Sequence, residues 1–516
     1  MPHNLSIERI NSVFDTIEQE IAVSSWEMDG LKIWPLIRNN HWLYLLSQKV
    51  FDSNNQIALN NNPAKQIKKI ISAGLSFVRA KQIDKKKNDH LRKTDLLIAV
   101  AASTRFFKVD GAWYSPYSDS LIKHFRAENI DSLVLEFASD GRCLLPRFAP
   151  SVFVQNQSYY LSIQAKLRGK LNFPPLKEHI DGWNDFLAII DRELGTDCRP
   201  DINTVRTKAR QILLHEQWFN KILQVIQPKV AIVGFSYCSA DAMGLIRACR
   251  KLGILTIEIQ HGVQGSEHMA YHHWARLPEQ GYDTLPEIFW TWGEDEKRNI
   301  DSWANSRPEA HRAMVGGNPC LHIYDQNGLC STHSNKTLLK KTEEQALNVL
   351  FTAQAFDSLP DFFIETIRQT PNWKWWIRIH PQYWEMEEPL RKQLEVNNLA
   401  NAVISTSSEL PLIGLLEQCD VHVTEFSSSV LEAQTCGVAS VVINPSAVNL
   451  FKELIDSEQV VYANSTELLI SAIKLQEKKK IHDIQSEDGS CFFPDIMKEI
   501  KKRTHSAVET VTTQGI

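Results

Sequence analysis

Residues 416–446 constrain the fold of this chain more than any other stretch. They read LEQCDVHVTEFSSSVLEAQTCGVASVVINPS, with a short apolar strand at 421–423, three serines at 427–429 and helical spacing that ends at Gly437. A second apolar run at 439–443 completes a β-α-β unit, which is typical of parallel, doubly wound α/β sheets. Serine is favoured at helix N-termini, where its hydroxyl and the free backbone N–H groups also suit an anion. The stretch therefore predicts a ligand-binding turn or, as the alternative, a serine-capped helix without a ligand.

A second polar strand end lies upstream of this turn. Residues 375–381 read WWIRIHP, an apolar strand that ends in Arg-x-His-Pro. Arg378 and His380 alternate with two isoleucines, so both should point to one face of the sheet, and Pro381 should end the strand. The carboxyl ends of parallel strands meet at one edge of a sheet, where ligands bind. We therefore expect both motifs to border one phosphate-binding crevice; the alternative is a charged residue at a sheet edge.

Together, these two motifs resemble the C-terminal half of bacterial GT-B glycosyltransferases that use CMP-sugars, such as sialyltransferases and the Kdo transferases of capsule and lipopolysaccharide assembly. The resemblance implies that the His-Pro and Ser-Ser elements hold the cytidine and the phosphate of the donor. CDP-glycerol glycerophosphotransferases share a related layout, so CMP-sugar, CDP-glycerol and UDP-sugar donors stay open. The expected donor-site residues are Arg378, His380, Pro381, Thr424, Ser427, Ser428, Ser429 and Glu432.

Composition limits the class of protein. A chain of 516 residues is too long for one compact core, and its net charge of −5 gives no support for a nucleic-acid partner. The nine cysteines are scattered without a Cys-x-x-Cys pair, which argues against a disulfide framework and fits a reducing cytosol. The first thirty residues carry several acids, and no apolar run approaches the roughly 20 residues of a membrane helix. We therefore expect a cytoplasmic protein of two or three domains.

The order of the predicted elements divides the chain into four parts. We expect a helical N-terminal extension with a basic linker at 1–92, a Rossmann-like acceptor domain at 93–322, a Rossmann-like nucleotide-sugar domain at 345–480 and a helical tail at 481–516. Strands alternate with helices in both halves, as in doubly wound sheets. The predicted fold class is thus α/β and GT-B-like, with two Rossmann-like domains facing a cleft. The charged, Lys-rich tail can cross back to the first domain.

Two segments of the extension carry signals of their own. Residues 30–38 read GLKIWPLIR and resemble a Trp-Pro-Leu-x-Arg segment near the start of capsule-type glycosyltransferases, for which packing is the favoured role and function of Arg38 the alternative. Residues 64–87 are basic and amphipathic, so they suit an anionic membrane surface, with a solvated helix and linker as the alternative. Peripheral contact with the inner membrane therefore stays open.

The N-terminal half carries a second group of polar strand ends. An apolar run at 254–259 ends in Gln-His-Gly at 260–262, an element that resembles one in capsule Kdo transferases, and His268 follows shortly after it. Asp241 follows the strand 229–235. The candidate catalytic residues, as base, nucleophile or proton relay, are Asp241, His261, Glu136 and His268. The alternatives are a helix N-cap for Asp241 and a structural, hydrogen-bonded role for His261.

The absence of several known motifs narrows the class of reaction that the protein can catalyse. The sequence has no Asp-x-Asp for a metal-bridged diphosphate, and the spacing of His268 and His272 lacks a carboxylate partner, so we expect no metal site. Without a P-loop or a Gly-x-Gly-x-x-Gly turn, a kinase and a dehydrogenase are disfavoured. We predict a metal-independent glycosyltransferase, without a cofactor beyond its CMP-sugar donor, that moves Kdo or sialic acid to a surface polysaccharide or lipid-linked glycan. A related transferase and a non-catalytic polysaccharide assembly protein remain alternatives.

Overall fold

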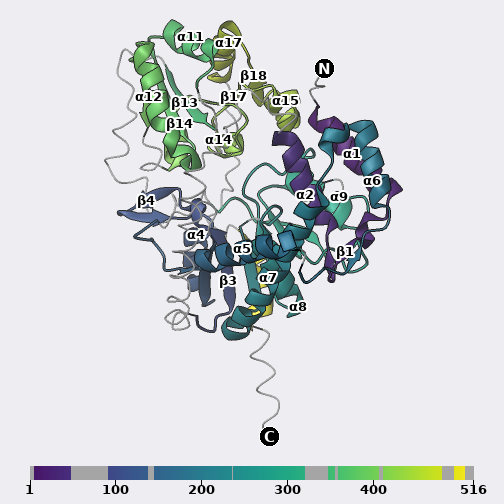
Figure 1. The fold of residues 1–516 in the computed structure, drawn as a ribbon. Helices are drawn as coiled ribbons and strands as arrows, with labels where there is room; N and C mark the ends of the chain where they lie inside the picture. The colour runs from purple at the N-terminus through teal and green to yellow at the C-terminus, as the bar shows by residue number, and fades with distance from the viewer. Residues whose placement is uncertain are drawn as a thin grey trace.

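The computed structural model describes ten segments of the chain, and the predicted basic segment at 64–87 lies outside them. The described residues are 5–47, 91–137, 144–171, 173–234, 236–272, 274–319, 347–354, 358–405, 411–478 and 493–505. Two parallel sheets form the two halves of the molecule, with residues 347–478 in green to yellow making up the upper half (Figure 1). Among the described helices, none combines the length and the apolar character needed to cross a bilayer.

The N-terminal half contains a seven-stranded sheet with the order β12-β11-β10-β9-β3-β6-β7. All of its pairings are parallel. Apolar clusters cover both faces, as expected for a parallel sheet with helices on each side. The strands are β3 (Leu96–Ala101), β6 (Ser132–Phe137), β7 (Val152–Phe153), β9 (Val230–Val233), β10 (Leu255–Ile259), β11 (Ile288–Thr291) and β12 (Arg312–Val315); the helices are α4 (Asp119–Ala127), α5 (Gln155–Leu171), α7 (Ile202–Ile226), α8 (Ala240–Lys251) and α9 (Glu294–Ala304).

The C-terminal half repeats this plan with a six-stranded parallel sheet of order β15-β14-β13-β16-β17-β18. Its strand order reverses between β13 and β16, as it does between β3 and β9 in the first sheet. The predicted fold class, two Rossmann-like α/β domains, is therefore confirmed. The strands are β13 (Leu347–Ala353), β14 (Trp373–Ile379), β15 (Ala402–Ser405), β16 (Val421–Thr424), β17 (Ser440–Val442) and β18 (Val460–Tyr462); the helices are α11 (Asp361–Gln369), α12 (Glu387–Val396), α13 (Leu412–Leu416), α14 (Ser429–Thr435), α15 (Ser446–Leu450), α16 (Lys452–Asp456) and α17 (Thr466–Gln476).

Residues 5–47 of the N-terminal extension pack against the first domain. They form α1 (Ile7–Glu20) and α2 (Trp34–Leu45), with the hairpin β1 (Glu27–Met28) and β2 (Leu31–Lys32) between them. They pack on α6 (Trp183–Glu193), and β1 pairs with β8 (Glu178–His179). One apolar cluster runs from α1 and α2 to Tyr271 and Phe289 of the first domain. The described part of the extension thus shares an apolar core with the first domain.

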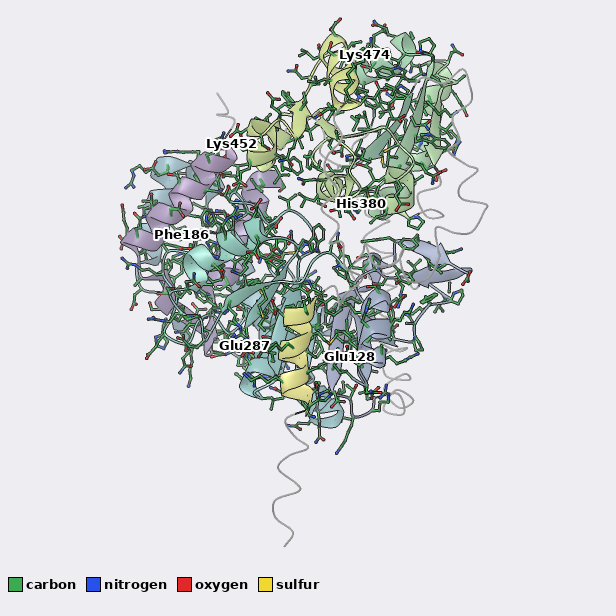
Figure 2. All side chains as sticks on the ribbon, turned by 180° about the vertical axis from the view of Figure 1, so that it is seen from behind. Glu128, Phe186, Glu287, His380, Lys452 and Lys474 are labelled. Carbon is green, nitrogen blue, oxygen red and sulfur yellow. The ribbon has the colours of Figure 1, made fainter. Side chains whose placement is uncertain are left out.

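The last described helix, α18 (Pro494–His505), belongs to the N-terminal half in space. Phe493, Ile496 and Ile500 are buried in the cluster that covers one face of the first sheet. Lys501 forms an ion pair with Glu128 at 2.6 Å. Figure 2 shows this yellow helix on the lower half, between the labelled Glu128 and Glu287. The tail therefore crosses back to the first domain, as its sequence allowed.

Candidate functional site

A pocket of about 130 Å³ lies between the two halves. Its walls come from the carboxyl ends of strands in both sheets. The lining residues of the N-terminal half are Phe106, Phe107, Pro116, Tyr117, His261 and Trp292. On the C-terminal side, His380 lies at the boundary between the halves (Figure 2). The two sheets thus face each other across one cavity.

The C-terminal wall lies where the strand order of the second sheet reverses. Thr352 and Ala353 end β13, and the serine turn follows β16, its neighbour on the other side of the reversal. Ligands of open α/β sheets bind at such a switch point. Arg378 and His380, from the end of β14, also line the pocket, whereas Ile377 and Ile379 lie in the apolar core. The alternation read from the sequence therefore places both polar side chains on the pocket side.

The three serines of the turn have different partners. The Ser429 hydroxyl lies 2.9 Å from Thr352 Oγ1 and 3.3 Å from Nε2 of the buried His422, so it is tied into the floor of the pocket. Ser427 Oγ accepts a hydrogen bond from the Ser429 N–H at 3.2 Å. Ser428 precedes α14 and makes no side-chain capping bond. Among the three, Ser428 has the hydroxyl best placed for a ligand.

His422 supports this floor and was not among the residues predicted from the sequence. Its ring nitrogens lie 2.9 Å from Thr352 Oγ1 and 2.9 Å from Ser440 Oγ. Burial lowers the pKa of His422 to about 3, so the ring is neutral at physiological pH. A polar residue inside an otherwise apolar strand was the available signal. Such a residue needs partners when it is buried, and one of its partners here, Thr352, lines the pocket.

Two further predicted donor-site residues take different positions. Thr424 is buried, and its hydroxyl donates to the Thr352 carbonyl at 2.9 Å, so it joins β16 to β13 and does not line the pocket. Pro381 opens the 3-10 turn Pro381–Met386 after β14. Thr424 thus supports the pocket wall through its bond to β13, and direct contact of Thr424 or Pro381 with a donor stays a prediction.

Glu432 is the carboxylate on the pocket wall. Burial raises its pKa to about 7, while the nearby Arg378 guanidinium acts in the opposite direction. Glu425, which follows β16, is also buried, and burial raises its pKa to about 7 as well. Glu432 can therefore gain or lose a proton near neutral pH, which suits either a hydrogen bond to a ligand or proton transfer.

Glu425 gives a testable pH dependence of stability. Its pKa in the folded protein, about 7, lies above the ordinary value of 4.5, so its contribution to stability is full below pH 4.5 and is lost as the pH rises through 7. Glu425→Gln should therefore raise the free energy of unfolding at pH 8 by about 1–3 kcal/mol and change it little at pH 5. Urea unfolding at both pH values measures this difference. The exposed Glu417→Gln serves as control, and an equal effect of Glu425→Gln at both pH values would contradict the assignment.

The opposite wall is formed by the Gln-His-Gly turn after β10. The His261 ring stacks on Tyr237 with centroids 5.7 Å apart, and the Tyr117 hydroxyl donates to the His261 carbonyl at 3.3 Å. Burial lowers the pKa of His261 to about 4, so the imidazole is neutral at pH 7. A Cβ atom on Gly262 would lie 3.7 Å from Ser428 Oγ. The two motifs that the sequence singled out in separate halves thus meet across the pocket.

Asp241 and Glu136 lie outside the pocket lining. The Asp241 carboxylate accepts hydrogen bonds from Ser158 Oγ and from the Ala242 N–H, both at 3.0 Å, in the first turn of α8. Glu136 pairs with Arg105 and Arg147 in a buried cluster. Partners within the chain occupy both carboxylates, so their catalytic assignment stays a prediction that these positions do not favour.

His268 is separated from His261 by the ring of Tyr237, which contacts both histidines. The His268 ring packs on Trp42 at 4.8 Å and on Tyr237 at 5.1 Å, and it does not line the pocket. Burial lowers its pKa to about 3. Of the four candidate catalytic residues, only His261 therefore reaches the cavity. Within the described parts of the chain, no three His, Cys, Asp or Glu side chains are placed to hold a metal ion.

Comparisons with known proteins found similarity only among solved structures; no protein-family model and no curated protein matched the chain. The UDP-GlcNAc 2-epimerase from Neisseria meningitidis bound to UDP-GlcNAc is 14% identical, with a TM-score of 0.45 over 81% of this chain and 100% of that one. The UDP-GlcNAc 2-epimerase from Methanocaldococcus jannaschii is 13% identical, with a TM-score of 0.44 over 78% and 98%. The alpha,alpha-trehalose 6-phosphate synthase from Burkholderia multivorans is 10% identical, with a TM-score of 0.41 over 82% and 99%. These TM-scores lie below 0.5, so they carry no inference about function.

Proposed function

We propose that this chain is a glycosyltransferase that takes its sugar from a CMP-sugar donor. One observation carries the proposal: Arg378, His380 and Ser428 line the C-terminal wall of a pocket at a switch point, and His261 lines the opposite wall. A donor held on one wall would present its sugar to an acceptor beside the other. Transfer requires the reacting atoms of two bound substrates to lie close together, and facing walls can hold them so.

The C-terminal wall suits the single phosphate of a CMP-sugar. The Arg378 guanidinium can form charge-assisted hydrogen bonds with phosphate oxygens, and the Ser428 hydroxyl can donate one more. Burial and the neighbouring Arg378 lower the pKa of His380 to about 4, so its neutral ring donates through one nitrogen. These groups can balance one phosphate and the charge that develops on the leaving group.

The N-terminal wall would supply the proton transfer. In the proposed reaction, an acceptor hydroxyl oxygen bonds to the anomeric carbon of the sugar, and the bond from that carbon to the phosphate oxygen breaks. CMP leaves with the electron pair, and the neutral His261 takes the hydroxyl proton. Arg378 stabilises the phosphate of the departing nucleotide. The acceptor would be a glycan or a lipid-linked glycan, as the motif resemblance implies.

Nucleotide binding tests this proposal directly. Isothermal titration calorimetry with CMP, CDP and UDP should show tightest binding of CMP. Ser428→Ala and His380→Ala should each weaken CMP binding by about 1–3 kcal/mol, because each removes a hydrogen bond to the nucleotide. Ser457→Ala, an exposed serine in the same half, should leave affinity unchanged.

Each contrary outcome has a definite meaning. Unchanged CMP affinity in the Ser428→Ala/His380→Ala double variant would contradict the assigned wall. Tighter binding of CDP or UDP would replace the CMP donor by CDP-glycerol or a UDP-sugar. No binding of any of the three nucleotides would favour a non-catalytic assembly protein.

A further inference from the structure

Gln260 makes an unusual set of hydrogen bonds at the end of β10. Its side chain is fully buried, and both ends of its amide have a partner. The Nε2 group donates to the Gly262 carbonyl at 2.8 Å, and Oε1 accepts from the Trp292 N–H at 2.6 Å. Its backbone N–H donates to the Trp290 carbonyl at 2.9 Å. One side chain thus joins two loops that follow neighbouring strands.

Both loops border the pocket between the halves. Gly262 belongs to the turn that carries His261, and Trp292 follows β11; His261 and Trp292 both line the cavity. The side-chain amide bridges these loops just beyond the last bond between β10 and β11. The Tyr117 hydroxyl also donates to the His261 carbonyl at 3.3 Å, and the His261 ring stacks on Tyr237. Gln260 differs from these partners because its side chain ties the turn to the neighbouring loop at Trp292.

The chemistry of this bridge suits an amide of this length. Gly262 offers a carbonyl and needs a donor, whereas Trp292 offers an N–H and needs an acceptor. The planar amides of asparagine and glutamine carry a donor and an acceptor side by side, and asparagine is shorter by one methylene group. A carboxylate would place an acceptor against the Gly262 carbonyl. The donor and the acceptor of the Gln260 amide thus match the Gly262 carbonyl and the Trp292 N–H.

We propose that Gln260 is a positioning residue that fixes the His261-Gly262 turn against the rim of the pocket. The same turn approaches the donor wall, since a Cβ atom on Gly262 would lie 3.7 Å from Ser428 Oγ. Gln260 therefore sets both the direction of the His261 ring and the distance between the two walls. The inference rests on the proposed function only in that His261 faces the reacting atoms; the placement of the turn itself does not depend on which donor binds.

Chemical modification of His261 in the ligand-free full-length chain tests this role. Diethyl pyrocarbonate modifies neutral, accessible imidazoles, and peptide mass spectrometry gives the rate at each histidine. Gln260→Met keeps the length of the side chain and removes both hydrogen bonds, so modification of His261 should accelerate at least fivefold. His268, which is half-buried and does not line the pocket, should react at an unchanged rate.

Gln264→Met provides the matched control. Gln264 is buried in the same loop, and within the described residues its side-chain oxygen accepts no hydrogen bond. This variant should leave the His261 rate unchanged. If Gln260→Met also leaves that rate unchanged, or accelerates His261 and His268 equally, Gln260 has no specific positioning role. Should Gln260→Met fail to fold, Gln260→Asn, which keeps the amide but is too short for both partners, should give the same selective acceleration.

Nucleotide affinity and turnover separate this inference from the proposed function. Gln260→Met should lower kcat at least tenfold with the donor class selected by calorimetry, and should change the nucleotide Kd less than threefold. Adding Gln260→Met to His261→Ala should then cause no further loss, since the first residue acts through the second. Additive losses would contradict the positioning role. Failure of all nucleotides to bind would overturn the proposed function. The rate of His261 modification would then still decide whether Gln260 positions the turn.

Discussion

Replacement of Arg38 by methionine is expected to destabilise the N-terminal half by about 3–5 kcal/mol, because it leaves a buried carboxylate without its counter-charge. The side chains of Arg38 and Glu18 are both fully buried, and Arg38 Nε lies 2.8 Å from Glu18 Oε1. The guanidinium also lies 4.1 Å from the Trp274 ring centroid and donates to the His272 carbonyl at 2.9 Å. This one side chain therefore connects the extension to the segment that follows the Gln-His-Gly turn.

Urea unfolding followed by tryptophan fluorescence measures this loss, since Trp34 donates to Glu18 Oε1 at 2.8 Å and Trp274 contacts Arg38. Arg9→Met is the matched control: Arg9 is half exposed and pairs with Glu193 at the surface, so its loss should cost less than about 1 kcal/mol. The double variant Glu18→Met/Arg38→Met should recover part of the stability, because no charge is then left buried. A loss below 1 kcal/mol in Arg38→Met would show that the pair does not hold the extension in place.

Replacement of His261 by alanine is expected to lower turnover by about a hundredfold and to leave nucleotide affinity nearly unchanged. His261 is the candidate base that lines the pocket, and it lies on the wall opposite the donor groups. Steady-state release of the nucleotide product and calorimetry measure the two quantities separately. Asp241→Asn tests the competing catalytic assignment; it should leave turnover near normal, because the Asp241 carboxylate is bonded to Ser158 and to the start of α8, outside the pocket lining.

The lowered pKa of His261 also predicts that the acid limb of the pH–rate profile lies at an unusually low pH. Burial lowers the pKa of His261 from 6.5 to about 4, so the base form persists as the pH falls and is lost only near pH 4. Turnover should therefore stay constant through pH 6.5, where an exposed histidine would become protonated. Near-normal turnover in His261→Ala would exclude this residue as the base. Glu432, the pocket carboxyl group with a pKa of about 7, would then be the next candidate.

Much of the fold followed from local patterns in the sequence. The apolar runs that became β14, β16 and β17 were visible as strands, and the strand–turn–helix order of residues 416–446 predicted a parallel sheet. Alternation along a strand then placed Arg378 and His380 on the pocket side, and carboxyl ends of parallel strands meet at one edge. Periodicity and chain direction are properties of the chain itself, so the positions of these backbone segments could be predicted.

Side-chain partners from distant segments could not be predicted in this way. Asp241, His261 and Glu136 all follow or end parallel strands. Ser158 donates a hydrogen bond to Asp241, and Arg105 and Arg147 form ion pairs with Glu136. Of the three residues, only His261 lines the cavity. Likewise, the sequence does not distinguish the three adjacent serines from one another. In the structure, the Ser429 hydroxyl lies within hydrogen-bond distance of Thr352 and His422 at the floor of the pocket. The sequence determined which residues lie at the sheet edges through local periodicity. Only the tertiary structure decided which of them face the ligand space, because burial makes each polar group hydrogen-bond to whichever partner the packing of remote segments brings within reach.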